Sequence, residues 1–258
     1  MNYRALENVR VPAKVFAKPF RPMTALGILV TGEPVEPVKR DRGSFTDLFR
    51  AVLAPRWPGA IVELDARRFE LPDPKDFAAL VVTGSASSVT ERSPWILATE
   101  RALVGFVSAG VPTLGVCFGH QLLGQALGGD VQQNPRGREI GTVETELFAD
   151  DPLFADLPRR LLVNMSHVDS VVALPPGARV LARTELEPHA AVRFGERAWG
   201  VQFHPEFDGT VMRGYIEARA TQVESEGIDL STLRAETSPD ATRILTRFTE
   251  LALRPSEI

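Results

Sequence analysis

The strongest constraint on the fold is the regular alternation of short apolar segments with amphipathic segments between residues 25 and 128. Four apolar runs have the length and composition of strands that are buried on both faces of a parallel sheet: residues 25–30, 60–64, 79–83 and 111–116. Three segments have helical spacing of apolar residues: 45–53, 94–108 and 117–127. This alternation predicts an α/β fold with a doubly wound, mainly parallel sheet flanked by helices.

Residues that cap or stop helices support these boundaries. Ser44 is a suitable N-cap for the first helix, Pro94 opens the second, and Gly110 ends it. Residues 31–43 combine Gly, Pro and alternating charges, so we interpret them as a loop.

The second half of the chain has a different pattern, with shorter strands separated by polar turns. It predicts a smaller antiparallel part, formed by residues 138–148, 161–165, 171–174, 178–184, 190–194 and 198–203, and helices at 208–224 and 241–253. We expect three parts in the chain: a basic N-terminal extension (1–24), an α/β domain (25–210) and a C-terminal helical addition packed on that domain (211–258).

Composition excludes several classes of protein. The net charge of −4 is unlike that of a nucleic-acid-binding domain, and no apolar run approaches the roughly 20 residues of a membrane span. Residues 1–24 lack the apolar core of a signal peptide, and the single cysteine, Cys117, excludes an internal disulfide. We therefore expect a cytoplasmic protein.

Residues 115–121, Gly-Val-Cys-Phe-Gly-His-Gln, place Cys117 between a predicted strand and a predicted helix. A nucleophile on so sharp a turn needs small neighbours, which Gly115 and Gly119 supply. The helix amino terminus lowers the pKa of the thiol and directs backbone N–H groups toward an oxyanion. The alternative is a buried, inert cysteine at a strand end; the two glycines favour the nucleophile.

His204 and Glu206 follow an apolar strand, in the segment Gly-Val-Gln-Phe-His-Pro-Glu-Phe at residues 200–207. Pro205 fixes the backbone between them, so that imidazole and carboxylate can be held within hydrogen-bond reach. A Cys–His pair oriented by an acid is the usual means of activating a thiol. Alone, this segment is weak evidence, because a histidine at a strand end is more often a surface or core residue. Together with Cys117 it predicts a catalytic triad.

These motifs resemble the class I, or triad, glutamine amidotransferase family, and most closely the amidotransferase part of GMP synthetase. The similarity covers about residues 25–210. Two further segments lie in the family order: Thr-Gly-Ser-Ala-Ser at 83–87, in the place of the oxyanion loop, and Met-Ser-His-Val-Asp at 165–169. The resemblance implies a flavodoxin-like fold and a cysteine-dependent amidohydrolase. It would cleave glutamine to glutamate and ammonia through a thioester, without a cofactor or metal.

The resemblance also implies roles for individual residues. Cys117 would be the nucleophile, His204 the general base and acid, and Glu206 the orienting carboxylate. The backbone of Gly84 and Phe118 would form the oxyanion hole. The substrate would be bound by Gln121 and by the backbone at Ser166, His167, Val168 and Asp169.

Alternatives stay open for two of these residues. Spacing alone favours Gln121 as an amide on the helix surface, and His167 fits a structural role that pins its loop as well as it fits substrate binding. His120 and His189 have no assigned role. Four scattered histidines and one cysteine form no cluster with metal-ligand spacing.

Two departures from the family bear on function. The loop at residues 83–87 replaces the Gly-Gly-Pro-Gly sequence that amidotransferases often have, and residues 211–258 contain neither a synthetase domain nor a Gly-x4-Gly-Lys-Ser/Thr phosphate loop. We expect a stand-alone hydrolase or one member of a two-subunit enzyme. In a two-subunit enzyme, the ammonia would pass to a separate synthetase subunit. Alternatively, the protein is an autonomous γ-glutamyl peptidase. A non-catalytic binding or regulatory relative is a third interpretation, against which the three intact triad residues argue.

Overall fold

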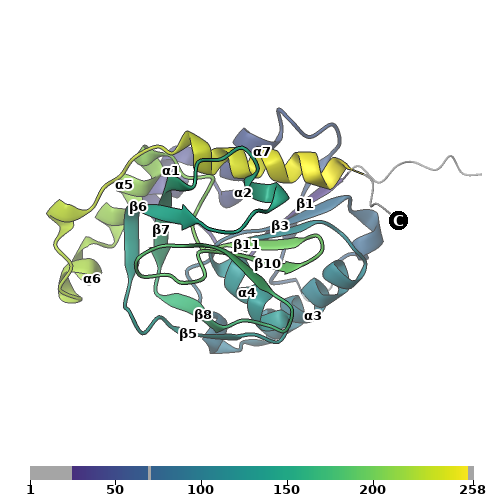
Figure 1. Cartoon of the computed structure of the whole chain (residues 1–258), viewed down its shortest axis with the longest axis horizontal. Coiled ribbons are helices and arrows are strands. Elements are labelled where there is room, and N and C mark those ends of the chain that lie inside the picture. The colour runs from purple at the N-terminus through teal and green to yellow at the C-terminus, as the bar shows by residue number, and fades with distance from the viewer. Residues whose placement is uncertain (1–24, 69–70, 255–258) are drawn as a thin grey trace, which may run out of the picture.

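The computed structural model describes residues 25–68 and 71–254, so the predicted extension at 1–24 lies outside the described residues. A nine-stranded sheet runs through the molecule in the order β2-β1-β3-β4-β11-β10-β9-β6-β7 (Figure 1). Its first five strands are parallel: β2 (Ile61–Asp65), β1 (Leu26–Val30), β3 (Ala79–Val82), β4 (Thr113–Val116) and β11 (Ala198–Val201).

Antiparallel pairing extends this sheet at the β11 edge. The four added strands are β10 (Ala191–Gly195), β9 (Arg179–Arg183), β6 (Glu139–Leu147) and β7 (Arg160–His167). A separate antiparallel pair consists of β5 (Asp130–Gln133) and β8 (Asp169–Ala173). The predicted α/β fold class, with a parallel sheet and a smaller antiparallel part, is confirmed.

Helices cover both faces of the parallel strands, because alternate strand residues point to opposite sides. Ile28 and Val81 belong to one core cluster, with side chains of α2 and α7, whereas Leu29 and Val82 belong to the other, with side chains of α3 and α4. The helices are α1 (Glu36–Arg42), α2 (Phe45–Leu53), α3 (Pro94–Ser108), α4 (Phe118–Ala126), α5 (Gly209–Ala218), α6 (Ala220–Ser225) and α7 (Pro239–Leu253). Short 3-10 turns are η1 (Pro74–Asp76), η2 (Val89–Glu91), η3 (Pro152–Phe154) and η4 (Leu230–Thr232).

The interpretation of residues 31–43 as a loop was wrong, because this segment contains α1. Val38 is buried, and a side chain at Gly214 of α5 would come within 2.7 Å of it. Tertiary packing therefore stabilises a helix that its proline and mixed charges do not indicate.

The structure also differs from expectation elsewhere. The helix predicted at residues 208–224 is interrupted at Arg219, which separates α5 from α6. The connection after it contains η4. Strand β5 was not predicted, because its sequence is polar and only Val131 is buried.

Helix α7 lies along the sheet face that α2 also covers (Figure 1). Its N-cap is Ser238, whose side chain accepts the N–H of Ala241. Ile244, Leu245 and Phe248 are fully buried, and the ring of Phe248 meets that of Trp199 edge-on. The C-terminal part of the chain thus contributes to the same core as the parallel strands.

Candidate active site

Cys117 occupies the turn between β4 and α4, with φ 53° and ψ −108°. This conformation is unfavourable for a residue with a side chain, and its cost is of the kind that functional sites retain. A Cβ on Gly115 would overlap the backbone of Gly119, and a Cβ on Gly119 would overlap the backbone of Val82. The expectation that both glycines make room for the turn is therefore met.

Backbone hydrogen bonds fix this turn to the sheet. The N–H of Cys117 donates to the carbonyl of Val201 at 2.8 Å, and the N–H of Gly119 donates to that of Thr83 at 3.1 Å. Because β3 and β11 flank β4, both bonds connect the turn to neighbouring strands. The strained conformation is consequently held by the rigid part of the fold.

His204 and Glu206 lie just beyond the end of β11, next to the Cys117 turn. The Nδ1–H of His204 donates to Oε1 of Glu206 at 2.7 Å, and Phe207 stacks on the imidazole ring at 4.0 Å between centroids. Gly84 packs close to the ring and to the turn, since a Cβ there would lie 2.9 Å from Cε1 of His204 and 3.8 Å from Cβ of Cys117. The ring is held in one orientation, on the same side of Gly84 as Cys117.

Thiol and imidazole are buried, with 6% and 3% of Cys117 and His204 exposed. Burial acts to raise the pKa of Cys117, but the charge and hydrogen bond of His204 outweigh it, so that pKa is lowered. Burial acts to lower the pKa of His204, but the charges of Glu206 and Cys117 outweigh it, so that pKa is raised. Both shifts favour a thiolate–imidazolium pair.

The residues expected to form an oxyanion hole meet at the Cys117 turn. Phe118 is the first residue of α4, where N–H groups have no partner within the helix. Gly84 faces the turn from the loop after β3. Its carbonyl accepts hydrogen bonds from the hydroxyls of Thr31 and Thr83, at 2.9 and 3.1 Å. These bonds hold the carbonyl on the side of Thr31 and so set the plane of the Gly84–Ser85 peptide group.

Gln121 is buried rather than at the helix surface, so the surface interpretation was wrong. Its Nε2 donates to the carbonyl of Asp169 at 2.7 Å and to Oε1 of Gln202 at 3.0 Å. A carbonyl can only accept, which fixes the orientation of the Gln121 amide. Its oxygen makes no hydrogen bond within the described residues and is left to accept a donor.

Residues 166–169 lie at the end of β7 and the start of β8. The Ser166 hydroxyl is buried and has no partner among the described residues. The Val168 carbonyl accepts the N–H of Asn134 at 2.8 Å, and a carboxylate oxygen of Asp169 accepts the hydroxyl of Ser88. This turn is therefore tied to β5 and to the loop that follows β3.

Two histidines without an assigned role are also placed by the structure. His120 is fully buried, 5.3 Å from the Phe194 ring, and burial lowers its pKa to about 3. It is a neutral core residue. Nδ1 of His189 contacts the carbonyl of Val171 at 2.6 Å.

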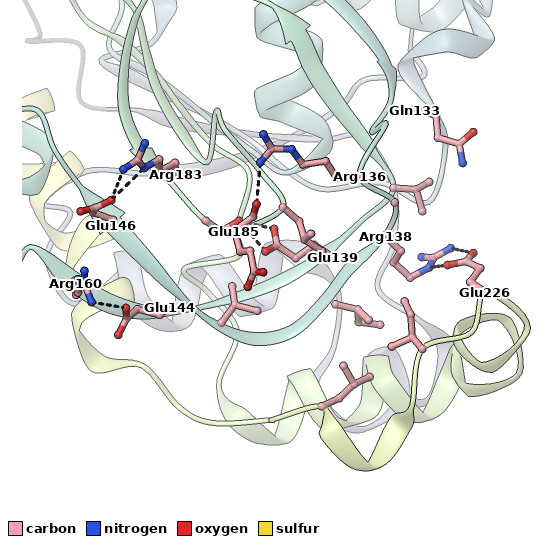
Figure 2. A pocket seen from close by; sticks show the side chains of 18 residues that line it. Gln133, Arg136, Arg138, Glu139, Glu144, Glu146, Arg160, Arg183, Glu185 and Glu226 are labelled. Atoms are coloured by element: carbon pink, nitrogen blue, oxygen red, sulfur yellow. Dashed lines mark hydrogen bonds and ion pairs between the residues drawn. The ribbon is translucent and has the colours of Figure 1, made fainter.

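A cavity of about 820 Å³ adjoins residues 166–169 through Val168 (Figure 2). Its apolar lining includes Ile140 and Leu233. Charged pairs surround it: Arg138–Glu226 at 2.7 Å, Arg183–Glu146 at 2.8 Å and Arg160–Glu144 at 3.4 Å. Figure 2 shows these pairs at separate positions around the cavity, with Glu139 and Glu185 between them.

Sequence reasoning missed several buried polar residues near the site: Thr31, Glu139, Thr184, Glu187 and Gln202. Gln202 carried a usable signal, because it is a polar residue between the apolar residues Val201 and Phe203. Glu139 and Glu187 carried none, because their proximity to His167 depends on strand pairing and on the course of a loop.

Comparison with known proteins agrees with this geometry. The family model for class I glutamine amidotransferases matches residues 44–222, more than half of the chain. This chain belongs to the class I glutamine amidotransferase family. Within that family the resemblance to GMP synthetase is also supported by individual relatives.

One subunit of the glutamine-hydrolysing GMP synthase of Pyrococcus abyssi is 44% identical over 108 residues, covering 42% of this chain and 57% of the relative. The GMP synthase of Aeropyrum pernix is 41% identical over 129 residues, covering 50% of this chain and 24% of the relative. The matched part therefore spans about a quarter of that full-length relative. A glutamine amidotransferase structure from Thermotoga maritima superposes with a TM-score of 0.65 at 22% identity, covering 90% of this chain and 99% of that one. It has the same fold.

Two searches within residues 25–68 and 71–254 gave negative results. No helix there has the length and hydropathy needed to cross a bilayer. No group of three or more His, Cys, Asp or Glu side chains there has the arrangement of a metal site.

Proposed function

We propose that the chain hydrolyses the γ-glutamyl amide of glutamine through a thioester on Cys117. The observation that carries this proposal is the thiol on a strained strand-to-helix turn, adjacent to an imidazole that Glu206 orients. A non-catalytic module gains nothing from a buried thiolate–imidazolium pair, which costs desolvation energy.

The proposed reaction uses these residues in two steps. The Cys117 thiolate attacks the γ-carbonyl carbon, and the oxyanion accepts the N–H groups of Phe118 and Gly84. The C–N bond breaks as His204 donates its proton to the departing nitrogen, which releases ammonia. His204 then takes a proton from water, whose oxygen attacks the thioester. Glutamate leaves, and the returned proton restores the starting pair.

The γ-glutamyl group would bind beside α4 and the turn at residues 166–169. The free oxygen of Gln121 is suited to accept the α-amino group, and the unpartnered Ser166 hydroxyl is a second polar group available to the substrate. The carbonyls of Val168 and Asp169 already accept hydrogen bonds from within the protein.

A glutamine-like chloroketone should label the protein once, at Cys117, and free glutamine should slow the labelling. Mass spectrometry of the intact protein and of its peptides measures both effects. Cys117→Ser is the control and should not be labelled. If glutamine does not change the labelling rate, the result supports a reactive thiol but contradicts a glutamine site beside it.

The fate of the ammonia separates two versions of the proposal. The Pyrococcus abyssi relative is named as one subunit of a GMP synthase, which supports transfer of ammonia to a separate synthetase subunit here. The altered loop at residues 83–87 instead favours autonomous hydrolysis of a γ-glutamyl compound. Ammonia and glutamate release by the purified chain, with glutamine and with a panel of γ-glutamyl peptides, distinguishes partner-dependent from autonomous action.

The pH dependence of kcat/KM should show a broad plateau. The pKa of Cys117 is lowered, so the acidic limb lies below the ordinary thiol range. The pKa of His204 is raised, so the alkaline limb lies above the ordinary imidazole value of about 6.5. Glu206→Gln should move the alkaline limb to lower pH, because the carboxylate charge helps to retain the imidazole proton. A narrow wild-type optimum ending near pH 6.5 would contradict the ion pair.

A further inference from the structure

The carbonyl oxygen of Asp169 accepts two side-chain hydrogen bonds. One comes from Nε2 of Gln121 at 2.7 Å and the other from Nδ1 of His167 at 2.9 Å. A carbonyl oxygen has two lone pairs, so both of its acceptor positions are occupied. The two donors come from different elements, α4 and β7, and therefore fix the position of the peptide group after Asp169.

The other ring nitrogen of His167 is also occupied. Its Nε2 lies 3.4 Å from Oε2 of Glu139, and Oε2 of Glu187 lies 3.9 Å from Nδ1. A carbonyl can only accept, so Nδ1 carries a proton, and a positive charge on the ring faces the carboxylates of Glu139 and Glu187. Burial opposes this charge, but the hydrogen bond to Glu139 and the charges of Glu187 and Glu139 outweigh it, which raises the pKa of His167.

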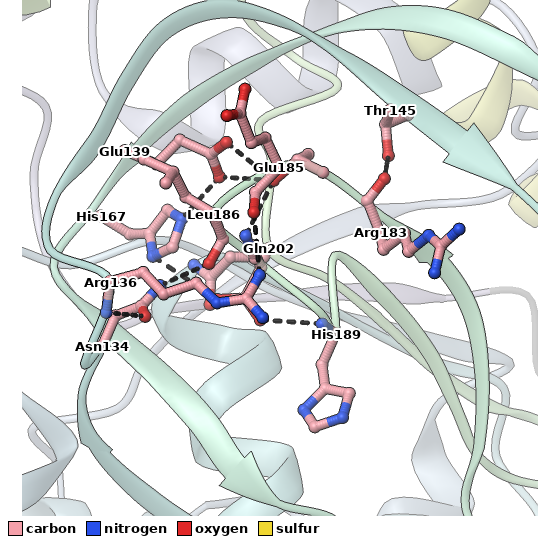
Figure 3. A network of polar contacts seen from close by, with 12 residues as sticks. Asn134, Arg136, Glu139, Thr145, His167, Arg183, Glu185, Leu186, His189 and Gln202 are labelled. Carbon is pink, nitrogen blue, oxygen red and sulfur yellow. Dashed lines mark hydrogen bonds and ion pairs between the residues drawn. The ribbon is translucent and has the colours of Figure 1, made fainter.

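Glu139 is itself held in place. Strand pairing of β6 with β7 sets Glu139 opposite His167, and the Thr184 hydroxyl contacts both carboxylate oxygens, at 2.7 and 2.9 Å. Figure 3 shows the Glu139 carboxylate and the His167 ring next to one another within this network. All three side chains are buried. The network therefore has few alternative arrangements.

We propose that His167 is a positioning residue, which holds the Val168–Asp169 turn in the shape that receives the α-amino and α-carboxylate groups of a γ-glutamyl substrate. Both of its ring nitrogens are engaged by the protein, so neither is left for the substrate. This inference rests on the proposed glutamine site. It assigns the structural role to His167 in preference to direct substrate binding.

A pair of variants of similar polarity tests this role. In His167→Asn, the side-chain amide can occupy the place of Nδ1 and donate to the Asp169 carbonyl. In His167→Gln, the amide can occupy the place of Nε2, so it remains near Glu139 but the bond to Asp169 is lost. We expect KM for glutamine to stay within about threefold of wild type in the Asn variant and to rise at least about tenfold in the Gln variant.

His189→Gln is the matched control, because it also removes an Nδ1 contact to a β8 carbonyl, that of Val171. It should leave KM unchanged. Alkylation of Cys117 by iodoacetamide, which needs no glutamine site, should proceed at similar rates in both His167 variants and so report an intact thiol. Thermal melting verifies that each variant is folded.

Equal KM values in folded Asn and Gln variants, or a higher KM in the Asn variant, would overturn the positioning role. A wild-type protein that neither hydrolyses glutamine nor is protected by it from labelling would instead refute the proposed function. The two failures are therefore distinguishable.

Discussion

Replacing His204 by alanine is expected to reduce glutamine hydrolysis by about 10²–10⁴-fold or more and to abolish thioester formation. In the proposed mechanism the His204 imidazole, which lies beside Cys117, holds the proton of the thiol. Glu206→Gln should retain partial activity, because the amide oxygen can still accept the Nδ1–H while the stabilising charge is lost. Steady-state ammonia release and trapping of the acyl-enzyme measure the two effects.

His189→Ala provides the control for His204→Ala, because it removes a histidine that the proposed mechanism does not use. It should leave turnover near the wild-type value. Since His204 stacks on Phe207, circular dichroism and thermal melting must first establish that His204→Ala is folded. Near-full activity in a folded His204→Ala protein would refute the triad.

Deletion of residues 238–258 is expected to cause aggregation or loss of folding. The deletion removes α7, whose fully buried Ile244, Leu245 and Phe248 pack into the core of the parallel strands. It also removes the Thr242 hydroxyl, which donates to the carbonyl of Pro205 between His204 and Glu206. Soluble yield, size-exclusion chromatography and labelling by the glutamine analogue measure the result.

Point variants test the packing of α7 without removing the helix. Phe248→Ala should lower the free energy of unfolding by about 3–5 kcal/mol, the usual loss for a buried aromatic residue. Arg243→Ala, on the exposed side of the same helix, should change it by less than about 1 kcal/mol. A soluble, fully active deletion variant would instead identify the tail as a dispensable arm.

The parallel half of the fold could be predicted because each of its elements has a strong local signal. The strand at residues 79–82 is entirely apolar, and α2 begins at a capping box formed by Ser44 and Asp47. Helix α1 could not be predicted, because Val38 becomes favourable in a helix only when it packs against Gly214. Strand β5 was missed for a related reason, since its polar sequence pairs with β8 at a distance along the chain.

The candidate site divides in the same way. Cys117, His204 and Glu206 were found because each lies in a short segment with its own chemical signature. The role of His167 could not be settled from the sequence, because it depends on Glu139, which faces it across a strand pair, and on Glu187, which approaches from a loop. Local signals thus located the groups proposed to react, and long-range pairing determines what supports them.

The position of β11 beside β4 has a consequence for the order in which the protein becomes reactive. Strands β1, β3 and β4 and helix α4 precede β11 along the chain, and during synthesis they emerge before it. The β4–β11 register, which sets Val116 opposite Val201, is what brings His204 to Cys117. In the proposed mechanism, the Cys117 thiol gains its base only when β11 has inserted between β4 and β10. Activation of the proposed nucleophile therefore depends on completion of the central sheet.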